Sequence, residues 1–412
     1  MTPLVGTDDW RVTVGLVSGG HFLSHFYILA FPPLFPMLRS DFALSNTELG
    51  VLVSIISLAG LLQMPVGSLV DRFGAKRVLV VGLSLTAIGT MLVGTANSYP
   101  MMLVFALLAG LGQSTFHPAD YSLIDAATKP DTEGRAFSVH TFGGYAGFAA
   151  APLVVGTLAL RFDWRVALLA TGAFGLVFAG LLMVLLDAIY LRQLDEQGPE
   201  SDTQSSLRSD LQALLKPTIL IMFAFFLVLT MGSKGISTFT PLLMVDTFGL
   251  TESVGNTTLT GFFTGAATGV LLGGMLADRY EPSRIIVLCL SIAALLLWMT
   301  VGGIVTLTSV TAIGLFGIIG FVSGLVYPSR DRLVNAFSTA GSTGRSFGFV
   351  FTGISVGGLI SPTLLGAVID ASTPMWAFLI VGGFYLAAAV IAFAIGTGAV
   401  TRTTPSTKAS GD

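Results

Sequence analysis

The chain consists of long apolar runs separated only by short stretches of Pro, Gly, Asn, Asp and charged residues. A helix that crosses a bilayer needs about 20 mostly apolar residues, and runs of that length recur along the 412 residues. Charged residues make up 10% of the sequence, against roughly 25% in soluble domains. The longest polar stretch, 191–216, is too short to fold alone. An ordinary soluble protein and a membrane-tethered soluble enzyme or receptor are therefore excluded.

The pattern predicts an all-α membrane protein with twelve transmembrane helices in two six-helix bundles related by pseudo-symmetry. We expect an N-terminal bundle in 1–190, a cytoplasmic linker loop in 191–216 and a C-terminal bundle in 217–412. The expected spans are 12–37, 47–69, 78–97, 100–124, 136–160, 166–189, 217–244, 257–277, 285–305, 309–334, 345–369 and 374–398.

Lys and Arg fall unevenly on the two sides of these spans. With a cytoplasmic N-terminus, 16 of them lie in the inner segments, and only Arg39, Arg161 and Arg165 lie outside. Because cytoplasmic loops carry an excess of Lys and Arg, both termini and the linker are predicted to be cytoplasmic. The excess of Arg over Lys and the acidic pI of about 5.8 indicate a high-GC or salt-adapted prokaryote, and we expect the protein in its cytoplasmic (inner) membrane. The net charge of −3 excludes a nucleic-acid binder.

The two halves repeat each other. The segment GSLVDRFGAKR at 67–77 recurs as GGMLADRYEPSR at 273–284, and HPADYSLIDAA at 117–127 aligns with YPSRDRLVNAF at 327–337. Repeats with the same orientation place a solute site near the bilayer midplane, between the halves. Pro118 and Pro328, in the second pair of segments, are expected to kink their helices.

Charged residues gather at the predicted inner ends of the helices, in and around the repeated segments. Opposite charges there can pair while one gate state is closed and separate when the halves rock. The alternative interpretation is that they only anchor loops and set the topology. The candidate gate residues are Gly67, Asp71, Arg72, Arg77, Asp120, Asp125, Arg135, Asp278, Arg279, Arg284, Asp331, Arg332 and Arg345.

GSLVDRFGAKR resembles the signature loop between helices 2 and 3 of the major facilitator superfamily, and the segment at 273–284 resembles its weaker counterpart between helices 8 and 9. Within that superfamily, SHFYILAFPPLFPML and GLGQSTFHPADYS look most like fosmidomycin-resistance-type efflux proteins. The resemblance implies transport by alternating access and favours efflux. Two features of drug antiporters are missing, because Ala106 replaces an Arg in helix 4 and Pro152 is not followed by Gly-Gly.

Polar residues within the predicted spans are the candidate site residues, because such residues usually face a water-filled cavity or one another. His21 and His25 are four residues apart and share one helix face. They can contact solute, carry protons, or be buried neutral imidazoles. A metal site at this spacing lacks an obvious third ligand, so no metal and no cofactor is expected.

The same reasoning extends to other spans, where interhelical hydrogen bonding is the competing interpretation for Gln113 and Tyr145. The candidate solute-binding residues are His21, His25, Tyr27, Gln113, Tyr145, Lys234, Tyr327 and Arg330. The candidate proton-coupling residues are His21, His25, His117, His140 and Asp120. Asp120 and Arg330 occupy equivalent positions in the repeats, and we expect them to pair when the inner gate closes. Local pairing of each is the alternative, Asp120 with Arg72 or Arg135 and Arg330 with Asp331.

The cavity inventory is rich in cations and imidazoles, which argues for an anionic or neutral solute. We therefore predict a monomeric secondary transporter that moves a small organic anion and is coupled to protons. The alternative is a proton-coupled carboxylate uptake symporter. An intramembrane enzyme is disfavoured because the chain has no His-Glu-x-x-His, Gly-x-Gly-Asp or Gly-x-x-x-x-Gly-Lys-Ser/Thr motif. A solute sensor is disfavoured because the chain has no sizeable signalling domain.

Overall fold

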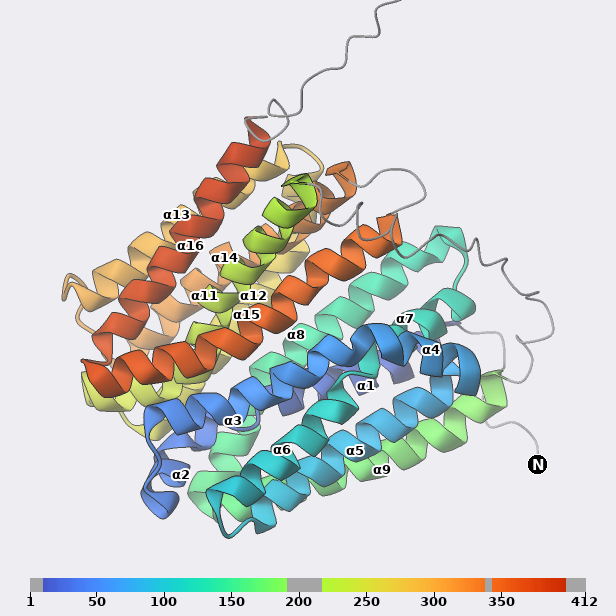
Figure 1. The fold of residues 1–412 in the computed structure, drawn as a ribbon, viewed down its shortest axis with the longest axis horizontal. Coiled ribbons are helices and arrows are strands. Elements are labelled where there is room, and N and C mark those ends of the chain that lie inside the picture. Colours follow the sequence, from blue (N-terminus) through green and yellow to red (C-terminus); the bar gives the residue numbers. More distant parts are fainter. Residues whose placement is uncertain (1–9, 191–216, 338–342, 398–412) are drawn as a thin grey trace, which may run out of the picture.

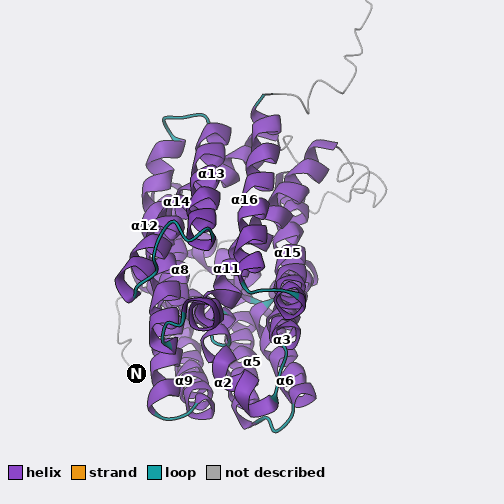
Figure 2. Cartoon of the chain, turned by 90° about the vertical axis from the view of Figure 1, so that its left-hand side faces the viewer, coloured by secondary structure: helices purple, strands orange, loops and turns teal. Residues whose placement is uncertain are grey.

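A computed structural model describes residues 10–190, 217–337 and 343–397. These residues form helices joined by short loops, and no strand occurs among them (Figure 2). Eleven stretches are long and apolar enough to cross a membrane, and a twelfth is reached if the bent pair Asn46–Leu62 and Pro65–Phe73 is one span. The predicted all-helical membrane fold with twelve spans is confirmed. Residues 191–216, the predicted linker, lie outside the described residues.

The helices fall into two bundles (Figure 1). The N-terminal bundle contains α1 (Trp10–Ile28), η1 (Pro32–Leu34), α2 (Phe35–Phe42), α3 (Asn46–Ala59), η2 (Gly60–Leu62), α4 (Gln63–Phe73), α5 (Ala75–Thr95), α6 (Tyr99–Gln113), α7 (Phe116–Ala127), α8 (Pro130–Arg161) and α9 (Trp164–Tyr190). The C-terminal bundle contains α11 (Pro217–Phe248), α12 (Glu252–Ala277), α13 (Pro282–Val301), α14 (Ser309–Phe337), α15 (Thr343–Ala371) and α16 (Met375–Gly396).

Two spans of the N-terminal bundle are broken at prolines. A proline ring clashes with the carbonyl four residues before it, which is Ser114 for Pro118, and the chain leaves the α-helix between α6 and α7 at this point. Near Pro65 the second span bends by 60° between its two helical segments, a break that the uninterrupted run 47–69 did not predict. The repeat is imperfect here, because α14 remains helical through Pro328.

Two helix pairs form the boundary between the bundles, α3 with α15 and α8 with α12. A two-fold exchange of the halves maps one pair onto the other, as the sequence repeat requires. At α3 and α15 the backbones approach so closely that a Cβ on Gly50 would overlap the carbonyl of Pro362. From the end of the molecule that carries α2, the bundles diverge toward the opposite end (Figure 1).

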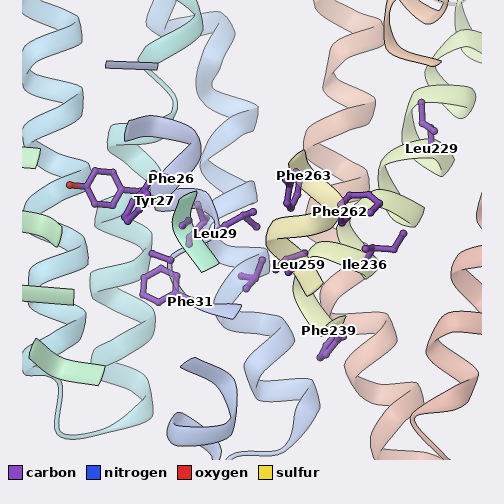
Figure 3. Close-up of a cluster of buried hydrophobic side chains, with 14 of the residues drawn as sticks. Phe26, Tyr27, Leu29, Phe31, Leu229, Ile236, Phe239, Leu259, Phe262 and Phe263 are labelled. Carbon is purple, nitrogen blue, oxygen red and sulfur yellow. The ribbon is translucent and has the colours of Figure 1, made fainter. Parts of the chain in front are cut away.

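Apolar side chains fill both bundles and meet at the boundary. Figure 3 shows residues of α1 on one side and residues of α11 and α12 on the other. Across the boundary, the rings of Phe35 and Phe239 lie 6.0 Å apart in an edge-to-face arrangement. The polar groups described next are therefore held in an apolar framework, where each unpaired group is costly.

Candidate coupling and solute site

All four histidines of the chain lie together in the N-terminal bundle with one buried carboxylate. His21 on α1 and His140 on α8 stack with ring centroids 3.8 Å apart. His25 and His117 lie 4.3 and 5.3 Å from His21 by the same measure. The Nδ1 atom of His21 lies 3.1 Å from Oδ2 of Asp120, which is fully buried on α7. We call these five residues the histidine cluster.

Local sequence features explain how the histidine cluster forms. One helical turn separates His21 from His25, as their spacing predicts. The break at Pro118 starts α7 as a new helix, and α7 carries Asp120 against α1. On α8, Gly144 makes room for the rings, because a Cβ there would lie 2.7 Å from Nδ1 of His25 and 2.8 Å from Nε2 of His21.

The structure corrects the expectation that His21 has no third metal-ligating partner. One ligand nitrogen from each of His21, His117 and His140 lies within 4.8 Å of the other two. Sequence spacing could not reveal this triad, because its members come from α1, α7 and α8.

An aromatic side chain separates the histidine cluster from the other bundle. The ring of Phe148 on α8 lies 4.2 Å from the ring of His25 and stacks 4.9 Å from that of Phe263 on α12. The cluster is therefore within one ring of the boundary, although its five members all belong to the N-terminal bundle.

Lys234 of α11 reaches the boundary from the opposite bundle. A Cβ on Gly358 of α15 would lie 3.5 Å from Cε of Lys234 and 2.9 Å from Oγ of Ser57, which belongs to α3. Lys234 and Ser57 therefore converge on one point between the bundles. Lys234 is half-buried and has no carboxylate within salt-bridge distance among the described residues.

Arg330 lies on α14 among aromatic rings. Its guanidinium carbon is 4.7 Å from the ring centre of Phe226 and 4.9 Å from that of Tyr327. The ring of Tyr327 lies 5.8 Å from that of Tyr145 on α8, so these tyrosines face each other across the boundary. Nε of Arg330 donates a hydrogen bond to Asp331 at 2.9 Å.

The expected pair between Asp120 and Arg330 is not formed in this structure. Asp120 contacts His21 and Arg330 contacts Asp331, so the local alternative holds for Arg330. The pairing remains a prediction for the state in which the inner gate is closed.

Two other candidates make contacts within the N-terminal bundle. The hydroxyl of Tyr27 donates to the carbonyl of Thr171 at 2.7 Å, and its ring points away from the C-terminal bundle (Figure 3). Contact between Tyr27 and solute stays a prediction. Gln113 donates to the carbonyl of Ser24 at 2.6 Å, which is the interhelical bond considered as its alternative role.

The two repeated loops differ in their contacts. In the second copy Asp278 pairs with Arg332 at 2.8 Å, between the end of α12 and α14. Both belong to the C-terminal bundle. The other candidate gate residues in and near the first copy are exposed and form no ion pair among the described residues. They are Asp71, Arg72, Arg77, Asp125 and Arg135. A Cβ on Gly67 would meet nothing, Arg279 and Arg284 are exposed, and the side chain of Arg345 lies outside the described residues.

The turn that follows each loop is capped differently. Gly74 directly precedes α5 and has a φ of 84°, a conformation that favours glycine. At the aligned position, the carboxylate of Glu281 accepts hydrogen bonds from the amides of Ser283 and Arg284. Partial burial alone would raise the pKa of Glu281, but these bonds, with that from the Ser283 hydroxyl and the charge of Arg284, lower it below its ordinary value.

A set of contacts at the α2 end was not predicted from the sequence. Arg39 and Asp246 form a bidentate ion pair between the bundles, with N–O distances of 2.5 and 2.8 Å. At the end of α15, Asp370 accepts four hydrogen bonds from the backbone and side chains of Asn46 and Thr47, at 2.6 to 2.9 Å. We call these five residues the outer latch, since the Lys and Arg bias predicts this end to be outside.

The outer latch uses a helix terminus as well as ion pairing. Asn46 and Thr47 open α3, whose first amides have no partner within the helix. A carboxylate at this position also interacts favourably with the positive end of the helix dipole. Asp370 therefore holds the start of α3 against the end of α15.

Comparison with known proteins agrees with this architecture. The chain is 24% identical over 374 residues to the fosmidomycin resistance protein of Escherichia coli (strain K12), covering 87% of this chain and 86% of that one. It is 25% identical over 378 residues to the hexuronate transporter of Bacillus subtilis (strain 168), covering 87% and 88%.

A crystal structure of a bacterial homolog to the human lysosomal transporter Spinster, inward-facing and occupied, superposes with a TM-score of 0.74 at 16% identity, covering 97% of this chain and 98% of that one. The profile of the Major Facilitator Superfamily matches residues 17–255 and 227–411. The chain is therefore a member of the Major Facilitator Superfamily of transporters.

Proposed function

We propose that this transporter moves a small organic anion by alternating access, coupled to protons, with export as the favoured direction. The observation that carries the proposal is the division of charge at the boundary between the bundles. The histidine cluster lies in the N-terminal bundle, and Lys234 and Arg330 lie in the C-terminal bundle. We assign solute binding to the cationic side and ion coupling to the imidazole side.

Lys234 and Arg330 support an anionic solute. Taking a positive side chain into a membrane span costs at least about 2.5 to 3.5 kcal/mol, and an anion that binds there recovers part of this cost. The guanidinium of Arg330 is held in place by rings at 4.7 and 4.9 Å and is suited to bidentate binding of a carboxylate or phosphonate. Ser57 adds a hydroxyl beside Lys234.

The ligand chemistry of the histidine cluster supports protons as the coupling ion. Sodium and other hard cations prefer oxygen ligands, and Asp120 is the one buried carboxylate in the cluster. Chains of Asp, Glu and His form proton relays in transporters. Four imidazoles around a single carboxylate fit such a relay better than a sodium site.

We assign this structure to the inward-facing state. The outer latch is closed at the end predicted to be outside, and the bundles diverge toward the other end (Figure 1). This assignment rests on the predicted topology, in which both termini and the 191–216 linker between the bundles are cytoplasmic in a prokaryotic inner membrane. We further propose that the monomer is the working unit, because both bundles of one chain contribute to the site.

Export is favoured by similarity to the fosmidomycin resistance protein of Escherichia coli. The alternative, proton-coupled uptake of a carboxylate, is favoured by similarity to the hexuronate transporter of Bacillus subtilis. For either direction of transport, we propose that the anionic solute binds between Lys234 and Arg330.

The test is uptake of labelled carboxylates and phosphonates into proteoliposomes, with a proton gradient of either sign and with the gradient collapsed. Solute accumulation that is driven by an inward proton gradient supports symport. Solute accumulation only when the proton gradient runs outward supports antiport and hence export. The control is Lys129→Met, which removes an exposed lysine just before α8. Transport that survives Lys234→Met and Arg330→Met unchanged would refute the assigned solute site.

A further inference from the structure

We propose that the histidine cluster is a binding site for one divalent transition-metal ion of the Zn²⁺ class. The ligands are one imidazole nitrogen from each of His21, His117 and His140, and Asp120 is the carboxylate behind His21. This site is independent of the solute and concerns a second ligand of the transporter.

The positions of the nitrogens carry the proposal. The three ligand nitrogens lie within 4.8 Å of one another. In a tetrahedral site with metal–nitrogen distances of about 2.0 to 2.1 Å, ligand nitrogens are roughly 3.3 Å apart. Binding one ion would therefore require the imidazoles to rotate, which separates the stacked rings of His21 and His140.

Unpaired nitrogens in the cluster also point to a ligand. Nδ1 of His117 and both ring nitrogens of His140 are buried and have no hydrogen-bond partner among the described residues. Buried polar atoms are usually paired, and an imidazole nitrogen without a partner has a free lone pair or an unshared proton. Neutral imidazole is a common ligand of Zn²⁺, Cu²⁺, Ni²⁺ and Fe²⁺.

Asp120 completes the arrangement from behind. Its Oδ2 lies 3.1 Å from Nδ1 of His21, so His21 can donate the Nδ1 proton and keep its other nitrogen for a metal. Metal-ligating histidines commonly donate their second N–H to a carboxylate, which fixes the tautomer and increases ligand basicity. The carboxylate also offsets one of the two positive charges in a fully buried position.

Fourth ligands are available beside the triad. Nδ1 of His25 is buried and unpaired among the described residues, and the ring lies 4.3 Å from that of His21. The triad draws its members from three helices of a single bundle. A bound metal would therefore brace the broken span at α7 against α1 and α8 without joining the two bundles.

The experiment measures binding directly, on the full chain purified with a tag that contains no histidine. Since the chain has four histidines in total, any imidazole-bound metal must then come from the cluster. The chain is stripped with a chelator and titrated with Zn²⁺ in detergent, with calorimetry and metal analysis as readouts. Co²⁺ provides a second probe, because its visible spectrum distinguishes tetrahedral nitrogen ligation.

The expected result is one Zn²⁺ for each chain, an increase in melting temperature, and a tetrahedral Co²⁺ spectrum. His117→Gln and His140→Gln should each abolish the site, and Asp120→Asn should weaken binding by about 10- to 100-fold. The matched control is Ser114→Ala, in the same region. The hydroxyl that it removes donates a hydrogen bond to the carbonyl of Leu111 at 2.7 Å. This variant should bind Zn²⁺ like the wild type.

Absence of stoichiometric binding to a folded wild-type chain, or binding that persists in His117→Gln and His140→Gln, would overturn the proposal. The folding of each variant is checked by its elution profile and melting temperature without metal. A variant that does not fold is replaced by Gly144→Ala, which crowds His21 and His25 and should weaken the site. The measurement needs no gradient and no solute, so its result is separable from the fate of the proposed transport function.

Discussion

Replacement of Asp370 by alanine is expected to shift the transporter toward the outward-open state. In the structure, this carboxylate accepts four hydrogen bonds from Asn46 and Thr47 at the start of α3. These bonds join the two bundles, so they must break whenever the outer end opens. In the open state, the carboxylate and the helix terminus would each be hydrated separately.

The size of the effect follows from these contacts. An intramolecular hydrogen bond contributes about 0.5 to 1.5 kcal/mol net, but Asp370 is exposed, so solvent screening reduces the four bonds together to about 1 kcal/mol. A carboxylate at a helix N-terminus adds about 0.3 to 1 kcal/mol. The sum is about 1 to 2 kcal/mol, which corresponds to a 5- to 30-fold change in the ratio of the two states.

The assay is a distance measurement between spin labels on the exposed residues Asn97 and Thr306, placed in loops on either side of the outer end, with Cys289 replaced by serine. Asp370→Ala should increase the population with the longer distance. Asp163→Asn is the control, because this carboxylate bonds to Arg165 in its own bundle. Equal distance distributions in the wild type and in a folded Asp370→Ala variant would refute the reasoning.

Three further predictions follow from other contacts. Arg39→Asp should increase the ratio of the open to the closed outer end in the same assay. The increase should be less than about fivefold, because exposed ion pairs contribute at most about 1 kcal/mol. The second change Asp246→Arg should reverse it, and additive defects would mean that the pair is not a latch. Lys234→Met should raise the KM for an anionic solute by about ten- to hundredfold, as expected for loss of a charged hydrogen bond. Lys234→Arg should recover part of this change. An equal increase in KM for a neutral solute would show that Lys234 has a structural role. Glu281→Gln should lower the melting temperature at neutral pH, because the pKa of Glu281 is lowered in the folded state. The resulting stabilisation is present above the ordinary pKa of glutamate and is lost as the pH falls through the lowered pKa. The melting temperatures of the wild type and the variant should therefore converge in acid, and a constant difference down to low pH would contradict the assignment.

The fold could be predicted almost completely from the sequence, because bilayer thickness sets the length of every span. The exceptions are local. The break near Pro65 was missed because the apolar run 47–69 continues through it, and length alone cannot show a bend. The equivalent prolines Pro118 and Pro328 behave differently, since only the first coincides with a break between helices. Tertiary packing decides that outcome.

The candidate site was predictable as an inventory and not as a geometry. The pair His21 and His25 could be placed on one face because helical periodicity is local. Convergence of His117 and His140 on that face depends on how α7 and α8 pack against α1, which no single-sequence pattern reports. Tyr27 was assigned to the cavity from its depth alone, whereas its orientation sends its hydroxyl to Thr171.

The outer latch was missed for a different reason. The positive-inside pattern draws attention to inner charges, and Asp370 belongs to no repeated motif. One signal was present, because Arg39 and Asp246 are 207 residues apart, close to the offset that relates the two halves. These two opposite charges therefore lie at nearly equivalent positions of the repeat, where they meet between the bundles.

The two seams between the bundles differ in character, and we expect this difference to give the opening motion a direction. At α3 and α15 the seam contains Ser54 hydrogen-bonded to Thr363 at 2.9 Å as well as the contacts of Asp370, and water can replace each of these bonds. Near the middle of α8 and α12 the other seam contains the stacked pair Phe148 and Phe263, whose separation would wet apolar surface. We expect the transporter to open like a door, with the aromatic seam as its hinge and the polar seam as its free edge.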